Sequence, residues 1–299
     1  MQAEIERVGR ISCTVGESPV WSAHDAAWYW VDIPARQLWR LDAASGASRH
    51  WQLAEMAGCI AIKADGGLIA GMETGIFDLA PGPDTSVQAT LLAAPPELEP
   101  GMRFNDGRCD RQGRFWSGTM FMATDPAAAR PDGRLYRYSR TAGLSAPVVS
   151  NLLTQNGLAW SPDGRTMYLS DSHPSSRCIW AFDYDPDAGV PHKRRLFVDM
   201  HQHRGRPDGA TIDVDGCYWI AGNDGGCLLR FTPAGRLDRT LELPLSKPSM
   251  ACFGGPNLDM LLVTSIKPGH HPGDKLAGSV LLVRPGVTGV AETPFGGGP

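Results

Sequence analysis

The chain has 299 residues, a hydrophobic share of 42% and a formal net charge of −4, and it contains 35 glycines and 24 prolines. This abundance of turn-forming residues argues against a helical protein, and a mildly acidic chain without a basic run argues against a nucleic-acid partner. No segment approaches the roughly 18 apolar residues of a membrane span, and the first ten residues lack the apolar core of a signal peptide. We therefore expect a soluble, cytoplasmic, β-rich protein that binds neither membranes nor nucleic acid.

The cysteines give no sign of a disulfide framework. They are odd in number, scattered along the chain, and form no CxxC pair. Such residues are expected to be small buried apolar side chains in a reducing compartment rather than metal or redox groups. The seven positions are Cys13, Cys59, Cys109, Cys178, Cys217, Cys227 and Cys252.

Six segments share one pattern of a strand, a polar turn and a second strand. They are, in chain order, 21–33, 62–73, 109–120, 160–172, 212–224 and 253–265. Four of the turns carry a glycine after a polar residue, because glycine tolerates positive φ. These glycines are Gly66, Gly113, Gly164 and Gly216, whereas Asp25 and Leu258 stand at the same position in the first and last segments.

A third strand follows each pair and ends in its own glycine or proline turn. The third strands begin at Leu38, Ile76, Leu135, Ile179, Leu228 and Val280. The repeat length is roughly 50 residues, which is typical of propeller blades. The sequence therefore predicts an all-β, six-bladed β-propeller formed by residues 1–299 as a single domain. Residues 4–12 precede the first blade and are expected to supply the outer strand of the last one; an array of β-sandwiches is the alternative.

The position eight residues before each turn is the start of an innermost strand in such a propeller. We call these positions the ring; they are Glu17, Gly58, Asn105, Asn156, Asp208 and Met250. Four of them are oxygen donors, and two buried carboxylates near an axis would cost several kcal/mol each without a cation. The alternative is that these side chains cap turns or bond neighbouring backbone. Gly58 and Met250 supply no donor, which would leave the ring one-sided and give a substrate room.

The donor set favours a hard divalent ion. All candidate ligands are carboxylate or amide oxygens, which suit Ca²⁺ best and also Mg²⁺ or Mn²⁺. Zinc remains possible but usually takes nitrogen and sulfur ligands. Three or four protein ligands leave positions open for water or substrate, so the site is expected to be reactive.

A second set of positions lies seven residues after each turn, at the far end of the second strand. Its members are Asp32, Glu73, Met120, Asp171, Asn223 and Ser265. Asp171 and Asn223 are expected either to hold the metal ligands in place or to satisfy the backbone of nearby loops.

Other polar clusters carry less weight. His201, His203 and Arg204 precede Asp208 in a loop that could overhang the pocket, but a solvated loop is the preferred interpretation, as it is for His270 and His271. Ser18 and Ser172 lack His and Asp partners in register, which argues against a serine hydrolase.

Several motifs resemble the senescence marker protein, regucalcin and gluconolactonase family. They are GESPVW from Gly16, RFNDGRCD from Arg103, GRFWSGTM from Gly113, QNGLAWSPDG from Gln155, RPDGATIDVDGCYW from Arg206 and CFGGPNLDMLLVTS from Cys252. The resemblance covers nearly the whole chain in the family's order. It implies a six-bladed propeller that hydrolyses sugar lactones with a divalent ion.

The resemblance also implies roles for individual residues. It makes Glu17, Asn156 and Asp208 the metal ligands, Asp208 the acid/base residue, and Arg103 and Asn105 substrate contacts. The alternative for Arg103 is an ion pair with Asp106. Animal members resembling regucalcin carry a substrate-binding Glu where this chain has Met122, so the preferred lactone is expected to differ.

The predicted function is therefore metal-dependent hydrolysis of a sugar lactone, such as gluconolactone or a pentonolactone, to the aldonic acid. The metal would polarise the carbonyl, and Asp208 would act as general base. Two alternatives remain, namely a metal hydrolase of phosphotriesters and a non-enzymatic calcium-binding regulatory propeller. A monomer or weak homo-oligomer is expected.

Overall fold

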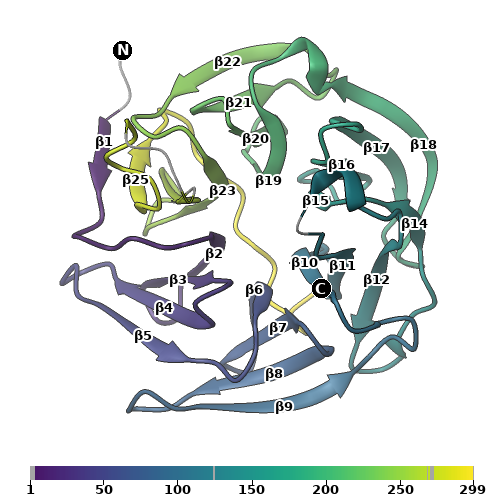
Figure 1. The fold of residues 1–299 in the computed structure, drawn as a ribbon, viewed down its shortest axis with the longest axis horizontal. Helices are drawn as coiled ribbons and strands as arrows, with labels where there is room; N and C mark the ends of the chain where they lie inside the picture. Colours follow the sequence, from purple (N-terminus) through teal and green to yellow (C-terminus); the bar gives the residue numbers. More distant parts are fainter. Residues whose placement is uncertain (1–3, 124, 268, 270–272, 299) are drawn as a thin grey trace.

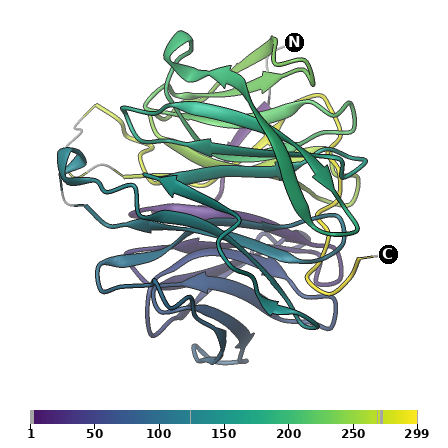
Figure 2. The same cartoon turned by 90° about the vertical axis from the view of Figure 1, so that its right-hand side faces the viewer.

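The six predicted repeats form six antiparallel sheets around a central channel in the computed structural model (Figure 1). The structure describes residues 4–123, 125–267, 269 and 273–298. Figure 2 shows the same sheets from the side of the molecule. This arrangement confirms the prediction of an all-β, six-bladed β-propeller.

The strands of each blade run in chain order from the channel outward. Blade 1 contains β2 (Gly16–Ser22), β3 (Ala27–Asp32), β4 (Gln37–Asp42) and β5 (Ser48–Gln52), and blade 2 contains β6 (Ala57–Ile62), β7 (Leu68–Met72), β8 (Ile76–Pro81) and β9 (Val87–Ala93). Blade 3 contains β10 (Met102–Cys109), β11 (Phe115–Phe121), β12 (Gly133–Ser139) and an outer edge divided into β13 (Gly143–Leu144) and β14 (Val149–Leu152). Blade 4 contains β15 (Gln155–Trp160), β16 (Thr166–Asp171), β17 (Cys178–Asp185) and β18 (Val190–Asp199). Blade 5 contains β19 (Arg206–Ile212), β20 (Tyr218–Asn223), β21 (Cys227–Phe231) and β22 (Leu237–Glu242).

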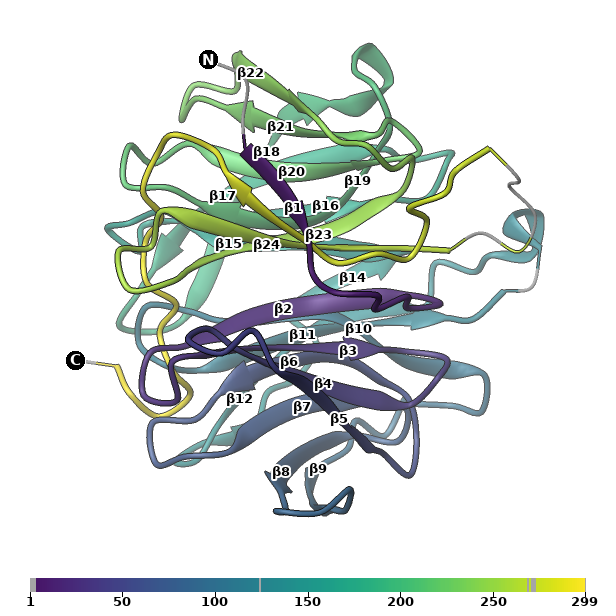
Figure 3. The ribbon, with the colours of Figure 1, turned by 90° about the vertical axis from the view of Figure 1, so that its left-hand side faces the viewer.

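The last blade is completed by the N-terminal end of the chain, as the sequence predicted. It contains β23 (Pro248–Gly254), β24 (Met260–Ser265), β25 (Leu281–Arg284) and β1 (Glu4–Arg7). β1 pairs antiparallel with β25, with Glu4 opposite Arg284, and Figure 3 shows the two strands side by side. The ring of blades is therefore closed by strands from both ends of the chain.

The turn between the first two strands of each blade adopts the predicted left-handed conformation. Gly66, Gly113, Gly164 and Gly216 have φ of +93°, +75°, +70° and +75°. In the last blade Leu258 takes this conformation with φ +55°. In the first blade the positive φ, +45°, falls on Ala26, one residue after the in-register Asp25; the connection there is residues 23–26, one residue shorter than in the other blades.

The hydrophobic core lies between the blades. Each cluster of buried side chains draws on two neighbouring sheets; one joins Val31 of blade 1 to Leu68 of blade 2, and another joins Tyr168 of blade 4 to Leu229 of blade 5. All seven cysteines are free, and all except the half-buried Cys178 are buried, as expected of small apolar side chains. The only helices in the described part of the chain are two single 3₁₀ turns, Pro126–Ala128 and Met200–Gln202, and neither approaches the length of a membrane span.

The two ends of the channel differ. The innermost strands all start at one end, which we call the ring end, and the β11–β12 connection lies there. The segment 285–298 crosses the opposite end, where Phe295 pairs with Lys63 of blade 2 and Gly289 pairs with Asp213 of blade 5. Figures 2 and 3 show the C-terminal segment and the β11–β12 connection on opposite faces of the molecule.

Candidate functional site

Every innermost strand breaks its pairing register at the ring. The shifts fall between Glu17 and Val20, Ala57 and Cys59, Phe104 and Gly107, Asn156 and Ala159, Pro207 and Ala210, and Pro248 and Ala251. A bulge of this kind adds a residue to one strand and changes the direction of its side chains. The repeated bulge explains why the same position in each blade can present a side chain at the ring end of the channel.

Amide side chains of blades 3 and 4 form a continuous hydrogen-bond network. Arg103 Nη1 donates to Asn105 Oδ1 at 2.7 Å, and Asn105 Nδ2 donates to Asn156 Oδ1 at 3.2 Å and to the Gln155 carbonyl at 2.7 Å. Asn156 Nδ2 in turn donates to Ser172 Oγ at 2.7 Å. This network directs the Oδ1 of Asn156 into the same small space as Asn105.

Arg103 does not form the ion pair with Asp106 that was the alternative expectation. Its Nη1 also donates to its neighbour's carbonyl, Phe104 O, at 2.8 Å. Asp106 instead accepts from the Leu158 amide at 2.8 Å, which ties blade 3 to blade 4. The guanidinium therefore contacts neutral acceptors and keeps donors available for a ligand.

Glu17 and Asp208 supply the two carboxylates of the ring. The surroundings of each destabilise its charged form. Burial is the largest cause that raises the pKa of Glu17 well above its ordinary value, followed by the negative charges of Asp208 and Asp106. Burial likewise raises the pKa of Asp208 to about 7, against the opposing charge of Arg206 and the hydrogen bond from Asn223. The two acids therefore lie close enough to compete for negative charge.

Asn223 and Asp171, which occupy equivalent positions, differ in what they contact. Asn223 Nδ2 donates to Asp208 Oδ2 at 2.7 Å and so orients that carboxylate. Asp171 instead accepts from the amides of Leu153 at 2.8 Å and of Thr154 and His173 at 3.0 Å. The interpretation as a loop-bonding residue is thus the one that fits Asp171, and its expected contact with a metal ligand is not seen among its hydrogen bonds.

The two ring positions without an oxygen donor, Gly58 and Met250, leave the donors of the ring on one side, and both are closely packed. A Cβ on Gly58 would lie 2.2 Å from the Phe104 carbonyl oxygen, so blades 2 and 3 approach each other too closely there for a side chain. Met250 fills its side of the channel, since a Cβ on Gly209 would lie 2.3 Å from its Cγ. Close packing and an apolar side chain therefore occupy these positions.

The remaining candidates lie in different places. Met122 follows β11 at the ring end, where its amide donates to the Gly101 carbonyl at 2.8 Å. His201 Nδ1 bonds Asp199 Oδ1 at 2.8 Å on the exposed side, and the ring of His203 packs against Phe231 with centroids 5.1 Å apart. His270 and His271 lie outside the described residues.

The ring fits a hard divalent cation. In the described part of the chain no three His, Cys, Asp or Glu side chains are grouped to hold a metal; the ring instead offers the carboxylates of Glu17 and Asp208 and the amide oxygen of Asn156. Of the Glu17 oxygens, Oε2 accepts from the Ser18 amide at 3.0 Å. A cation between two carboxylates with raised pKa values would remove their repulsion, and oxygen donors of this kind suit Ca²⁺, Mg²⁺ or Mn²⁺.

Two charged neighbours of the ring were not found from the sequence. Asp106 is buried and raises the pKa of both Glu17 and Asp208, and strict strand alternation would have pointed it away from Asn105. Arg206, at the start of β19, lies beside Asn223, with Nη2 3.4 Å from its Oδ1. Both residues lie within two positions of a ring residue in the sequence. That closeness predicts a place at the site only when the bulge in the strand is known.

Comparison with known proteins identifies the family. A family model described as SMP-30/gluconolactonase/LRE-like region matches residues 15–267. The chain is 37% identical over 304 residues to a 6-deoxy-6-sulfogluconolactonase of Pseudomonas putida, covering 99% of this chain and 100% of that protein. It is 34% identical over 304 residues to the regucalcin of Xenopus laevis, covering 98% and 99%.

A solved structure supports the same assignment at the level of the fold. The calcium-binding protein regucalcin from Agrobacterium tumefaciens superimposes with a TM-score of 0.89 at 24% identity, and the match covers 99% of this chain and 98% of that one. Together with the family model and the relatives more than 30% identical over nearly their whole length, this shows that the chain belongs to the SMP-30/gluconolactonase/LRE-like family.

Proposed function

We propose that this protein hydrolyses a sugar lactone to the corresponding aldonic acid with the help of one divalent cation, most favourably Ca²⁺. The observation that carries the proposal is that burial destabilises the charged forms of two carboxylates, Glu17 and Asp208, beside the amide network of Asn105 and Asn156. The family and the name of the Pseudomonas putida relative supply the reaction type.

Glu17, Asn156 and Asp208 would hold the cation. When bound there, the cation supplies a Lewis acid for the lactone carbonyl and for the negative charge that develops on its oxygen. Glu17 and Asp208 offset the charge of the ion.

Asp208 takes the proton of the attacking water in this mechanism. The water oxygen adds to the carbonyl carbon, the bond to the ring oxygen breaks, and the proton passes from Asp208 to the departing alkoxide. Burial raises the pKa of Asp208 to about 7 in the metal-free protein, and the positive charge of a bound cation would offset this and keep the carboxylate ionised as a base. Asn223 holds Oδ2 of Asp208 by a 2.7 Å hydrogen bond, which leaves Oδ1 to face the reacting atoms.

Arg103 and Asn105 bind the substrate. Arg103 uses its Nη1 on Asn105 and Phe104, so its remaining N–H groups can donate to substrate oxygens. Asn105 is held by hydrogen bonds to both Arg103 and Asn156. Arg103 and Asn105 therefore form a rigid polar surface for the hydroxyl groups of the substrate.

Three positively charged side chains near the ring end are available to an anionic substituent of the lactone. Arg206 Nε lies 2.8 Å from Asp224 Oδ2, and Lys247 Nζ pairs with the other oxygen of the same carboxylate. Arg206 and Lys247 thus pair with the single carboxylate of Asp224, and Arg103 adds a third positive charge. A sulfonate at the end of the sugar, as in the name of the Pseudomonas putida relative, is compatible with this balance.

The proposal predicts the outcome of a substrate and metal panel. Metal-stripped protein should release acid from aldonolactones only after a divalent cation is restored, and a sulfonated hexonolactone should have a higher kcat/KM than gluconolactone. Acid release is followed with a pH indicator, and Ca²⁺, Mg²⁺, Mn²⁺ and Zn²⁺ are tested separately. Faster cleavage of a phosphotriester than of any lactone would overturn the proposal.

Met122 is expected to contribute to substrate choice. Met122→Glu places a negative charge at the ring end and should lower kcat/KM for a sulfonated lactone about tenfold, which corresponds to roughly 1.4 kcal/mol. The neutral variant Met122→Gln has a similar size and should change it less than about threefold. Equal losses in the two variants would show that charge at this position does not matter.

A further inference from the structure

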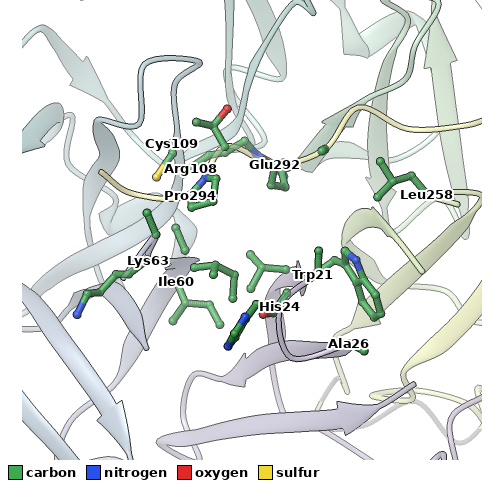
Figure 4. A pocket seen from close by; sticks show the side chains of 18 of the residues that line it. Trp21, His24, Ala26, Ile60, Lys63, Arg108, Cys109, Leu258, Glu292 and Pro294 are labelled. Atoms are coloured by element: carbon green, nitrogen blue, oxygen red, sulfur yellow. Dashed lines mark hydrogen bonds and ion pairs between the residues drawn. The ribbon is translucent and has the colours of Figure 1, made fainter. Parts of the chain in front are cut away.

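A cavity lies at the opposite end of the channel from the ring. Its volume is about 500 Å³, within the range of roughly 300 to 1,000 Å³ that is typical of small-molecule sites. The walls are the far ends of β2, β6 and β10, and residues 291–294 of the C-terminal segment cross beside them. Figure 4 shows side chains from these elements converging on one space.

The cavity wall is predominantly apolar. Side chains from four blades and the C-terminal segment contribute to it, and they include Val20, Trp21, Ile60, Ile62, Leu258 and Pro294. Trp21 is 9% exposed and Ile60 is 1% exposed, so these faces are fixed by packing in the propeller core. A preformed apolar wall of this kind favours a ligand with an aromatic or aliphatic body.

The charged groups of the cavity are neutralised within the protein. Arg108 pairs with Glu292 of the C-terminal segment, and Lys63 Nζ lies 2.6 Å from Asp78 Oδ2. Figure 4 shows the amino group of Lys63 directed away from the cavity. An ionic ligand would find no uncompensated opposite charge on this wall, so a neutral ligand is favoured.

Arg108 nevertheless retains hydrogen-bonding capacity. It is 7% exposed and donates through Nη2 to the Ala210 carbonyl at 2.5 Å. Its Nε is buried without a hydrogen-bond partner among the described residues, so a ligand in the cavity would have to accept from the Nη atoms. A guanidinium carries five N–H donors, so the pair with Glu292 and the bond to Ala210 leave some of them unused beside the apolar wall.

This cavity is separate from the ring. Met250 stands at a ring position and also lines the cavity, and thus lies between the two. None of Glu17, Arg103, Asn105, Asn156 and Asp208 contributes to the cavity wall. Occupation of one space therefore does not require occupation of the other.

We infer that this cavity is a second ligand site, for a neutral and largely apolar small molecule with a carbonyl or hydroxyl oxygen that accepts from Arg108. The apolar body packs on Trp21 and Ile60, and the oxygen faces the guanidinium. The site does not depend on the proposed lactone hydrolysis.

The inference is tested by fluorescence titration of the full-length protein with the neutral naphthyl ketone dye prodan. Saturable binding is expected with a Kd on the order of 10–100 µM, given the size of the dye. Thr293→Trp fills the cavity from the C-terminal segment and should weaken binding at least about tenfold. Thr288→Trp lies on the same segment outside the wall, and it should leave the Kd within about twofold.

Further variants separate the contributions of shape and hydrogen bonding. His24→Trp fills the cavity from the β2–β3 turn and serves as a second obstruction if Thr293→Trp does not fold. Arg108→Lys keeps the charge opposite Glu292 but removes the guanidinium donors, and should weaken prodan binding about fivefold, equivalent to one hydrogen bond. Lactone hydrolysis by Thr293→Trp should match that of the wild type.

Four results would overturn the inference. They are the absence of saturable prodan binding, binding unchanged in both tryptophan variants, displacement of the dye by a saturating lactone, and tighter binding of the anionic dye anilinonaphthalene sulfonate than of prodan. The third of these would place the dye at the ring instead of in the cavity.

Discussion

Asp208→Asn is expected to lower kcat for lactone hydrolysis by about 10²- to 10⁴-fold, the usual contribution of a general base, while the propeller stays folded. The amide keeps the size of the side chain but offers one oxygen in place of two, and it cannot accept a proton at neutral pH. Asn223 can still contact the substituted side chain, so the hydrogen bond at 2.7 Å is not lost for steric reasons. The measurement is the initial rate of acid release at saturating metal, with circular dichroism to verify the fold.

Asp171→Asn is the matched control for this experiment. Asp171 is a buried carboxylate one blade away, and its partners are the amides of Leu153, Thr154 and His173. The substitution should lower the stability of these loops by about 1–3 kcal/mol and leave kcat within a few-fold of the wild type. If Asp208→Asn keeps more than about a tenth of the wild-type rate, Asp208 is not the general base.

The fold was predictable because each repeat carries its own local signals. The four turn glycines all adopt positive φ where the spacing placed them, and the N-terminal strand pairs with β25 as expected. Local chemistry fixes these features, since a left-handed turn between two short apolar strands has few alternatives. In the first turn, where no glycine marks the position, the left-handed residue is Ala26, one residue after the in-register Asp25.

The ring was predictable only in part, because counting along the chain gives positions and not surroundings. The spacing selected Glu17, Asn105, Asn156 and Asp208, and the structure brings their blades together at one end of the channel. Gly58 was expected to leave room for a substrate, but a Cβ there would clash with the carbonyl oxygen of Phe104. These two residues are 46 positions apart in the sequence, so local patterns do not reveal the contact. Asp106 was missed because its direction depends on a bulge that the sequence does not mark.

The cavity under the C-terminal segment could not be predicted from sequence patterns. It depends on where residues 291–294 cross the channel, and this follows from single contacts such as the pairing of Phe295 with Lys63. The segment has no repeat of its own and little apolar periodicity. The pair between Arg108 and Glu292 spans most of the chain, so neither residue carries a local signal of the other.

Removal of the metal is expected to make the wild-type protein less stable than Asp208→Asn at pH 8, and this difference should be smaller at pH 5. The pKa of Asp208 is about 7 in the folded protein and near 3.9 in an unfolded chain. Between these values the folded state holds a proton that the unfolded state lacks, so the free energy of unfolding falls as pH rises through this window and is constant above it. Asparagine is a neutral analogue of the protonated acid and does not suffer this loss.

Addition of the cation should reduce that difference. At a concentration of about 100 times Kd a ligand stabilises the folded state by roughly 2.7 kcal/mol, and the wild type, which offers both carboxylates, should gain more than Asp208→Asn or Glu17→Gln. The gain should also be larger at pH 8 than at pH 5, because protons compete with the metal for the same oxygens. Thermal unfolding of the three proteins with and without Ca²⁺ at the two pH values measures these effects. Equal stabilities of metal-free wild type and Asp208→Asn at both pH values would mean that the Asp208 charge carries no penalty, and the argument for a cation at the ring would then fail.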